Sequence, residues 1–184
     1  MIEILAREHF DQVFTIMEAS FPKDEYRTYH EQKALMDNPK YEIYVVKDSQ
    51  TDAGSTFTMG SIKAFIAVWE FDTIVFIEHF AVNPMYRNSG IGSSMLEEVC
   101  GLYDKIICLE VEPPEDEITR RRVGFYQRNH FFFNSYHYMQ PSISKGRKEI
   151  PLFIMTYGRP VSESEFEAIK ILLYKEVYKQ INPN

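Results

Sequence analysis

Residues 83–95 read Asn-Pro-Met-Tyr-Arg-Asn-Ser-Gly-Ile-Gly-Ser-Ser-Met, and they follow the apolar run Thr-Ile-Val-Phe-Ile-Glu-His-Phe-Ala-Val at 73–82. The apolar run predicts a buried strand, and the helical spacing of apolar residues from 95 predicts a helix to about residue 103. Gly90 and Gly92 allow the backbone to approach a ligand closely. Free backbone N–H groups beside a helix start attract anions, so the stretch predicts a phosphate or pyrophosphate site.

The glycine spacing narrows the class of phosphate ligand. A P-loop would end in Gly-Lys-Ser/Thr, which does not occur here, and a dinucleotide fingerprint would need a glycine where Met95 stands. What remains is Arg87-x-x-Gly90-x-Gly92 after a strand that ends at residues 80–82. This pattern resembles the acetyl-coenzyme A signature of the Gcn5-related N-acetyltransferases (GNAT). The alternative interpretation is a glycine turn before an ordinary helix.

Composition predicts a single globular domain spanning residues 1–184, with 45% hydrophobic and 26% charged residues. Twenty Lys and Arg against 27 Asp and Glu give a net charge of −7, which argues against a nucleic-acid partner. The first residues lack the pattern of a signal peptide, and no apolar run is long enough to span a membrane. We therefore expect a cytoplasmic protein without a membrane partner, in which Cys100 and Cys108 are buried thiols.

Hydrophobic periodicity predicts the remaining elements in chain order. A strand at 2–6, helices at 8–20 and 28–36, a strand at 41–47 and a polar turn at 49–55 precede a long strand at 56–70, interrupted at Gly60. After the 73–82 strand and its helix we expect a strand at 105–111, a helix at 119–128 and strands at 131–140 and 151–158. Ser162 and Glu165 fit a capping box for a final helix at about 162–180.

This order is similar to that of the GNAT fold, an α/β (α+β) architecture with a mixed central sheet flanked by helices. Residue pattern alone gives only an α/β mixed sheet. The resemblance covers about residues 2–158, and the final helix is an addition that either covers the sheet, which we favour, or forms a dimer contact. It also implies that the sheet splays apart between its fourth and fifth strands, 73–82 and 105–111, where acetyl-coenzyme A lies.

The resemblance implies an N-acetyltransferase that moves the acetyl group of acetyl-coenzyme A to a primary amine by direct attack in a ternary complex. The alternative is a catalytically inactive acyl-coenzyme A sensor or interaction module with the same fold. The acceptor is a small-molecule or peptide amine, expected to contact residues 21–29 and 136–148, where a basic loop at 144–148 weakly suggests an acidic acceptor. The five histidines show no metal-ligand spacing, so no metal is expected. The chain is expected to be a monomer or homodimer.

Tyr126 is the leading catalytic candidate. It lies in Arg-Val-Gly-Phe-Tyr-Gln-Arg-Asn-His-Phe at 122–131, which is similar to the family's helix ending Phe-Tyr-x-x-x-Gly-Phe. In that pattern the tyrosine hydroxyl is the general acid for the coenzyme sulfur. His130 replaces the usual glycine and must accept a left-handed conformation at the helix end. The competing interpretation of Tyr126 is a core aromatic beside Phe125.

The base is left open among several carboxylates. Glu110 resembles the strand-five glutamate of ribosomal-protein N-terminal acetyltransferases, and its alternation with Cys108 predicts partial burial and a raised proton affinity. Glu78 resembles the strand-four glutamate of other relatives. Glu112 is a third candidate, and a water chain without a single base is the remaining alternative.

The resemblance also implies the cofactor-binding residues. The Val82 N–H is expected to donate to the thioester oxygen, and small Ala81 suits close approach. The implied set comprises Phe80, Ala81, Val82, Arg87, Asn88, Ser89, Gly90, Ile91, Gly92 and Ser93. The arginines at 120–122 either form a solvated face paired with residues 115–117 or contact a coenzyme phosphate or an acidic acceptor.

Overall fold

The computed structural model describes residues 1–48 and 60–179 of the 184-residue chain. They contain a seven-stranded sheet in the order β1-β2-β3-β4-β5-β7-β6. The strands are β1 (Glu3–Ile4), β2 (Tyr41–Lys47), β3 (Ile62–Glu70), β4 (Ile74–Val82), β5 (Ile106–Val111), β6 (Phe131–Gln140) and β7 (Ile150–Tyr157). The α-helices are α1 (Phe10–Ser20), α2 (Tyr29–Ala34), α3 (Ile91–Cys100), α4 (Glu117–Arg128) and α5 (Glu163–Glu176), and short 3-10 helices are η1 (Arg7–His9), η2 (Lys23–Glu25), η3 (Leu35–Asp37) and η4 (Pro84–Tyr86).

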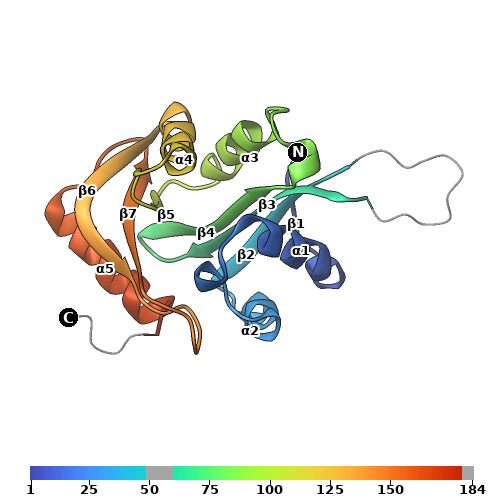
Figure 1. Ribbon diagram of the computed structural model, residues 1–184, viewed down its shortest axis with the longest axis horizontal. Coiled ribbons are helices and arrows are strands. Elements are labelled where there is room, and N and C mark those ends of the chain that lie inside the picture. Colours follow the sequence, from blue (N-terminus) through green and yellow to red (C-terminus); the bar gives the residue numbers. More distant parts are fainter. Residues whose placement is uncertain (49–59, 180–184) are drawn as a thin grey trace, which may run out of the picture.

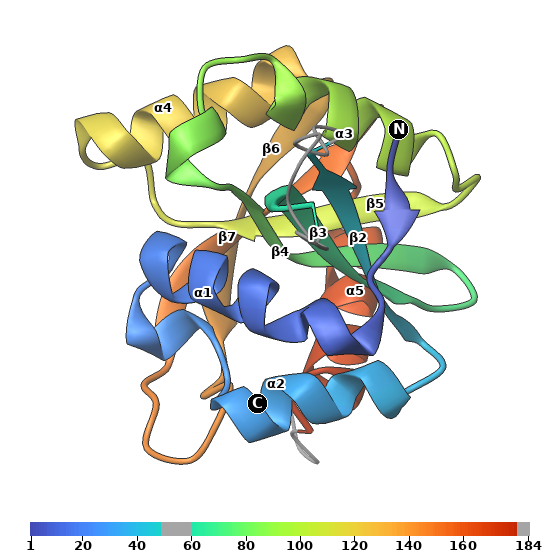
Figure 2. The ribbon, with the colours of Figure 1, turned by 90° about the vertical axis from the view of Figure 1, so that its right-hand side faces the viewer.

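The sheet lies between two layers of helices (Figure 1), with α3 and α4 on one side and α1 and α2 on the other (Figure 2). Each layer buries its own apolar cluster, and α5 belongs to the cluster of α1. On α5 the helically spaced apolar residues Phe166, Ile169 and Leu173, followed by Val177, are at most 3% exposed. The final helix therefore covers the sheet, as we favoured.

The sheet splays apart between β4 and β5, as predicted. These strands pair in parallel only from Ile74 with Ile106 to Ile77 with Leu109. The next residue of β4, Glu78, is the extra residue of a bulge, since the register with β3 passes from Ile77 directly to His79. Because a bulge bends its strand, β4 turns away from β5 at the point where their pairing ends. The chain thus has the GNAT fold, with a gap where the family resemblance places it.

Several boundaries differ from those predicted. The final helix ends at Glu176 rather than near 180, and the N–H groups of Val177 and Tyr178 both donate to the Leu173 carbonyl. Lys179 then adopts a left-handed backbone with φ 57°, and residue 180 itself lies outside the described residues. Helix α4 begins two residues early because Asp116 caps it in a box with Thr119. The first strand is only two residues long, and the expected turn at 49–55 and start of β3 at 56–59 fall outside the described residues.

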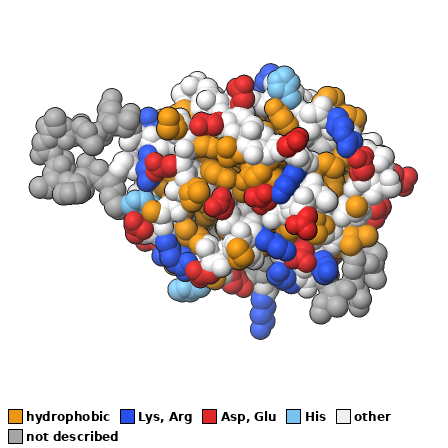
Figure 3. Space-filling model, turned by 180° about the vertical axis from the view of Figure 1, so that it is seen from behind, with side chains coloured by type: hydrophobic (Ala, Val, Ile, Leu, Met, Phe, Trp, Pro, Cys, Tyr) orange, Lys and Arg blue, Asp and Glu red, His pale blue; other side chains and the backbone are white. Residues whose placement is uncertain are grey.

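On the face shown in Figure 3, acidic and basic side chains are interspersed around a band of apolar side chains. Cys100 and Cys108 are buried free thiols, as expected. Across residues 1–48 and 60–179, no helix is long and apolar enough to cross a bilayer. The same ranges hold no group of three or more His, Cys, Asp or Glu residues arranged for a metal ion.

Candidate active site

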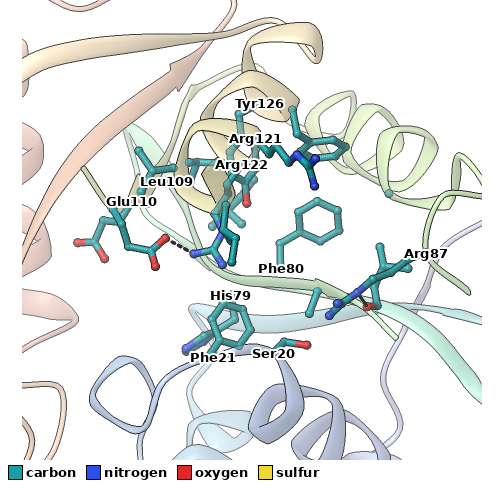
Figure 4. Close-up of a pocket in the computed structure, with 18 of the residues that line it drawn as sticks. Ser20, Phe21, His79, Phe80, Arg87, Leu109, Glu110, Arg121, Arg122 and Tyr126 are labelled. Carbon is teal, nitrogen blue, oxygen red and sulfur yellow. Dashed lines mark hydrogen bonds and ion pairs between the residues drawn. The ribbon is translucent and has the colours of Figure 1, made fainter. Parts of the chain in front are cut away.

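A cleft of about 890 Å³ opens between the separated ends of β4 and β5. Figure 4 shows Arg87 at one end of it and Glu110 at the other, with Phe80, Arg122 and Tyr126 between them. All of the predicted catalytic and cofactor-binding residues line this one cleft. Segments from residue 19 to residue 152 contribute to its walls, so the sheet assembles the site from most of the chain.

One end of the cleft is a cradle of backbone N–H groups at residues 88–93. Gly90 and Asn88 have positive φ angles of 81° and 62°, which turn the chain sharply before α3 begins at Ile91. Among the described residues, no acceptor bonds the N–H groups of 88–93, and the first helical bond runs from Ser94 to the Gly90 carbonyl. A Cβ at Gly92 would lie 3.3 Å from the Val82 side chain, so glycine keeps the wall open. Unpaired N–H groups at a helix start fit the pyrophosphate of coenzyme A.

The exposed backbone of β4 forms the adjoining wall. The N–H of Asn83 donates to the Lys63 carbonyl of β3 at 2.8 Å. Because backbone groups alternate sides along a strand, those of Phe80 and Val82 face the gap, whereas those of Ala81 face β3. The Val82 carbonyl accepts from Arg87 Nε at 3.2 Å. By the same alternation, the Val82 N–H is directed at the cleft. An extended ligand arm can pair with this free edge.

Tyr126 lies on α4 at the middle of the cleft, 8% exposed. Its ring packs against Phe125 and Phe131, with centroids 5.4 and 5.7 Å away. Tyr126 therefore lies among core aromatic residues and also lines the cleft, so each of the two interpretations describes part of its surroundings. Burial raises the pKa of Tyr126 to about 12, so the hydroxyl carries its proton at neutral pH. The helix end behind it takes the left-handed turn that we expected of His130, at φ 66°.

Two of the candidate bases are held in ion pairs. Glu78 lies 2.7 Å from Arg27 Nη1, with side chains 2% and 8% exposed. Burial opposes its charge, but Arg27 and neighbouring His79 outweigh that cost and lower the pKa of Glu78 to about 2. Glu112 pairs with Arg122. A carboxylate with so low a pKa as that of Glu78 binds protons weakly and makes a poor base at neutral pH.

Glu110 is in a different electrostatic environment. Its Oε2 accepts a hydrogen bond from the Tyr178 hydroxyl at 2.7 Å, and its buried Oε1 has no hydrogen-bond partner among the described residues. Burial raises the pKa of Glu110 to about 7, against the effect of the Tyr138 and Tyr178 hydroxyls, which lower it. The charges of Glu78 and Glu25 raise it further. A base with a pKa near the working pH is suited to proton transfer.

Glu25 lines the cleft, within the segment 21–29 that we expected to contact the acceptor, but the sequence did not single out its carboxylate. It lies in a polar break after α1, the pattern of a solvated loop, but η2 turns it towards β4, where the Glu25 carbonyl accepts from His79 Nε2 at 2.9 Å. Burial, then the charge of Glu112, raises the pKa of Glu25 to about 7. In the part of the chain that the structure describes, no ion pair offsets the Glu25 carboxylate. Long-range packing therefore decides the electrostatic environment of this carboxylate.

The predicted acceptor segments contribute in part. Phe21, Glu25 and Gln140 line the cleft, but the Tyr136 hydroxyl donates to the Val161 carbonyl instead. The basic loop packs away from the cleft, where the Lys148 N–H donates to the Asp24 carboxylate at 3.2 Å. The charged groups at this end of the cleft are therefore mainly carboxylates.

The arginine cluster at the start of α4 is paired mainly with neighbouring acidic and backbone groups. Arg121 pairs with Glu117 one turn away at 2.6 Å, and Arg120 donates to the Glu115 carbonyl at 2.6 Å. This arrangement is the solvated face that the sequence offered as one interpretation. Arg121 nevertheless lines the cleft, as does Arg122.

Comparisons with known proteins agree with this geometry. Residues 39–131, half of the chain, match the family described as Acetyltransferase (GNAT) domain. YjbC of Bacillus subtilis (strain 168), which is named as an acetyltransferase, is 32% identical to this chain over 116 residues. The matched residues span 61% of this chain and 58% of YjbC. The chain thus matches less than two thirds of that relative's length.

Solved structures show the same fold. A chain from Bacteroides thetaiotaomicron assigned to the GNAT family is 29% identical, with a TM-score of 0.82 over 99% of both chains. Arabidopsis thaliana NAA60, solved in complex with acetyl-CoA, is 15% identical, with a TM-score of 0.64 over 85% of this chain and 97% of NAA60. Its likeness shows the fold alone. The matched family domain, the splayed sheet and the cradle before α3 lead to one conclusion: the chain belongs to the GNAT family of acetyltransferases.

Proposed function

We propose that the protein transfers the acetyl group of acetyl-coenzyme A to a primary amine, by direct attack of the amine in a ternary complex. The observation that carries the proposal is a single cleft with an N–H cradle at residues 88–93 and the unpaired carboxylate of Glu110 at its other end. The cradle, with Arg87 beside it, would hold the pyrophosphate. The free β4 edge at Phe80 and Val82 would hold the pantetheine arm, and acetyl-coenzyme A would supply the reactive thioester.

The chain's own groups then have distinct tasks. Glu110 takes a proton from the ammonium group, because only the neutral amine attacks the acetyl carbon. As the new C–N bond forms, the Val82 N–H stabilises the negative charge on the acetyl oxygen. The C–S bond then breaks, and the hydroxyl of Tyr126 donates its proton to the departing sulfur. The second proton of the attacking nitrogen leaves to solvent as the neutral amide forms, and Tyr126 regains a proton from solvent. Each task falls to a group that lines the cleft.

We further propose that the acceptor carries a second positive charge rather than an acidic group. At the acceptor end, Glu78 and Glu112 are paired with arginines, whereas Glu25 and Glu110 form no ion pair among the residues described. The charge of Arg122 offsets that of Glu25 only in part, since burial still raises the pKa of Glu25 to about 7. Two carboxylates without ion pairs in a partly buried site attract cations. This charge arrangement favours a diamine over a monoamine and disfavours an amino acid with a free carboxylate.

Binding of acetyl-coenzyme A is tested by thermal unfolding. At about 100 times its dissociation constant a ligand adds about 2.7 kcal/mol to stability, so we expect a rise in Tm of roughly 5–10 °C for a chain of this size. Free coenzyme A should also raise Tm, whereas NAD, which lacks the pantetheine arm, should not. An unchanged Tm with millimolar acetyl-coenzyme A would contradict the proposal.

A second experiment, turnover with three four-carbon amines, tests the acceptor class. We expect thiol release to be fastest with 1,4-diaminobutane, slower with butylamine and slowest with 4-aminobutyrate. Binding without turnover of any amine would instead support the inactive sensor or interaction module. The fastest rate with 4-aminobutyrate would contradict the cationic acceptor and leave the acetyl transfer standing.

Replacing Tyr126 with Phe tests the general acid. Because a thiolate is a stable leaving group near neutral pH, loss of its proton donor should lower kcat modestly, by roughly 10- to 100-fold, at the lower end of acid catalysis. The matched control is Tyr103→Phe, which removes a half-buried hydroxyl that bonds Tyr44 outside the cleft. Equal turnover in the Tyr126→Phe variant and the wild type would show that this hydroxyl is not the acid.

A further inference from the structure

The chain segment directly after α5 contacts the acceptor end of the cleft. The apolar stripe of α5 anchors the helix in the core, and Val177 and Tyr178 continue it with exposed fractions of 3% and 8%. These two residues lie far beyond residues 39–131, which match the family domain. The end of the helix is therefore fixed in place beside the cleft.

Two hydrogen bonds connect this segment to the carboxylates of the cleft. The Tyr178 hydroxyl donates to Glu110 Oε2 at 2.7 Å. The Val177 carbonyl accepts from Arg27 Nη2 at 3.3 Å, and Nη1 of the same guanidinium pairs with Glu78 at 2.7 Å. One short segment thus bonds Glu110 directly and Glu78 through Arg27.

The Tyr178 bond fixes which oxygen of Glu110 is available. Burial, then the charge of Glu110, raises the pKa of Tyr178 well above its ordinary value, so the phenol stays protonated and acts as a donor. With Oε2 bonded, Oε1 is the oxygen without a partner among the described residues. Among the other groups packed around Glu110, the Tyr138 hydroxyl also lowers the pKa of this carboxyl, whereas the charges of Glu78 and Glu25 raise it. Burial and, less strongly, the charge of Glu110 raise the pKa of Cys108 and of Tyr174, which are neutral and do not bond it.

We infer that Tyr178 is a positioning residue for Glu110, so that the segment after α5 belongs to the active site. The inference rests on the proposed function, in which Glu110 is the base. The hydrogen bond from Tyr178 holds the Glu110 carboxylate in one orientation and directs Oε1 to receive the ammonium proton. Tyr178 keeps its own proton throughout, and the proton on Oε1 passes to solvent after the product leaves.

The test compares Tyr178→Phe with the wild type by two measurements. The Tyr178 hydrogen bond favours the ionised carboxylate, so its loss should raise the pKa of Glu110 by about one to two. Carbon-13 NMR titration of the glutamate carboxyl carbons, assigned with Glu110→Gln, measures this directly without turnover. With acetyl-coenzyme A and 1,4-diaminobutane, the rising limb of kcat against pH should move upward by the same amount.

Tyr174→Phe is the matched control. Tyr174 lies on the same helix, is also 8% exposed, and donates to the Met139 carbonyl instead of to Glu110. The Tyr174→Phe substitution should leave the rising limb of kcat against pH in place, even if the substitution lowers stability. An unchanged Glu110 pKa in Tyr178→Phe, or lower activity with an unmoved limb, would overturn the inference while wild-type turnover still supports the proposed function. If the wild type shows no turnover, both the proposed function and the inferred role of Tyr178 are contradicted.

Discussion

Replacing Glu110 with Gln is expected to lower kcat by roughly a hundredfold to ten thousandfold, the usual contribution of a positioned general base. Glutamine keeps the shape of the side chain and can still accept from Tyr178, so the fold should be retained. The substitution also removes a buried charge, whose desolvation raises the pKa of the carboxyl to about 7. The measurement is kcat at saturating acetyl-coenzyme A and 1,4-diaminobutane.

The pH dependence gives this prediction its sharpest test. A base works only when ionised, so wild-type kcat should rise with pH and level off above about 7, where Glu110 has lost its proton. Glu110→Gln should lack this limb. The matched control is Glu25→Gln, because Glu25 lies in the same cleft with its pKa also raised to about 7. Loss of the limb in the control alone would make Glu25 the base, and its retention in both variants would favour a water chain.

Replacing Arg27 with Met is expected to lower the free energy of unfolding by about 3–5 kcal/mol, because it leaves a buried charge unpaired. The Glu78 side chain is 2% exposed and would lose its ion pair with Arg27, and the Val177 carbonyl would lose its donor. Urea denaturation with the slope held common measures the change. The exposed pair of Arg7 and Asp37 provides the matched control, since Arg7→Met should cost about 1 kcal/mol or less.

The sign of the pH effect follows from Glu78. Its pKa is lowered from 4.5 to about 2, so the ion pair contributes stability that is present above 4.5 and lost as pH falls towards 2. Without Arg27, burial raises the pKa of Glu78 instead. Protonation of Glu78 at acidic pH should therefore stabilise the variant and reduce the difference in free energy of unfolding between variant and wild type. A second variant, Arg27→Met with Glu78→Leu, should recover much of the loss because no buried charge remains. A deficit that is equal at neutral and acidic pH would contradict this account.

Much of the fold followed from local pattern. Strands β2 and β6 have the predicted bounds, because their content of β-branched and aromatic residues is a local signal. Gly90 and Gly92 marked the cradle, because a left-handed turn and a close wall both require glycine. The family resemblance supplied what pattern did not: the gap between β4 and β5 and the place of Tyr126 beside it.

Alternation along the strand predicted the raised pKa of Glu110, but the tertiary structure decided how the other carboxylates differ from it. Glu78, Glu110 and Glu112 are similar strand glutamates in sequence, but Arg27 lowers the pKa of Glu78 from 51 residues away and Tyr178 bonds Glu110 from 68 residues away. Glu25 entered the cleft only through the packing of η2 on β4. The sequence by itself determined the elements, the cradle and the set of candidate residues. Which carboxylate is paired and which is free depends on burial and on partners distant in the chain, because a pKa is set by the surroundings that folding creates.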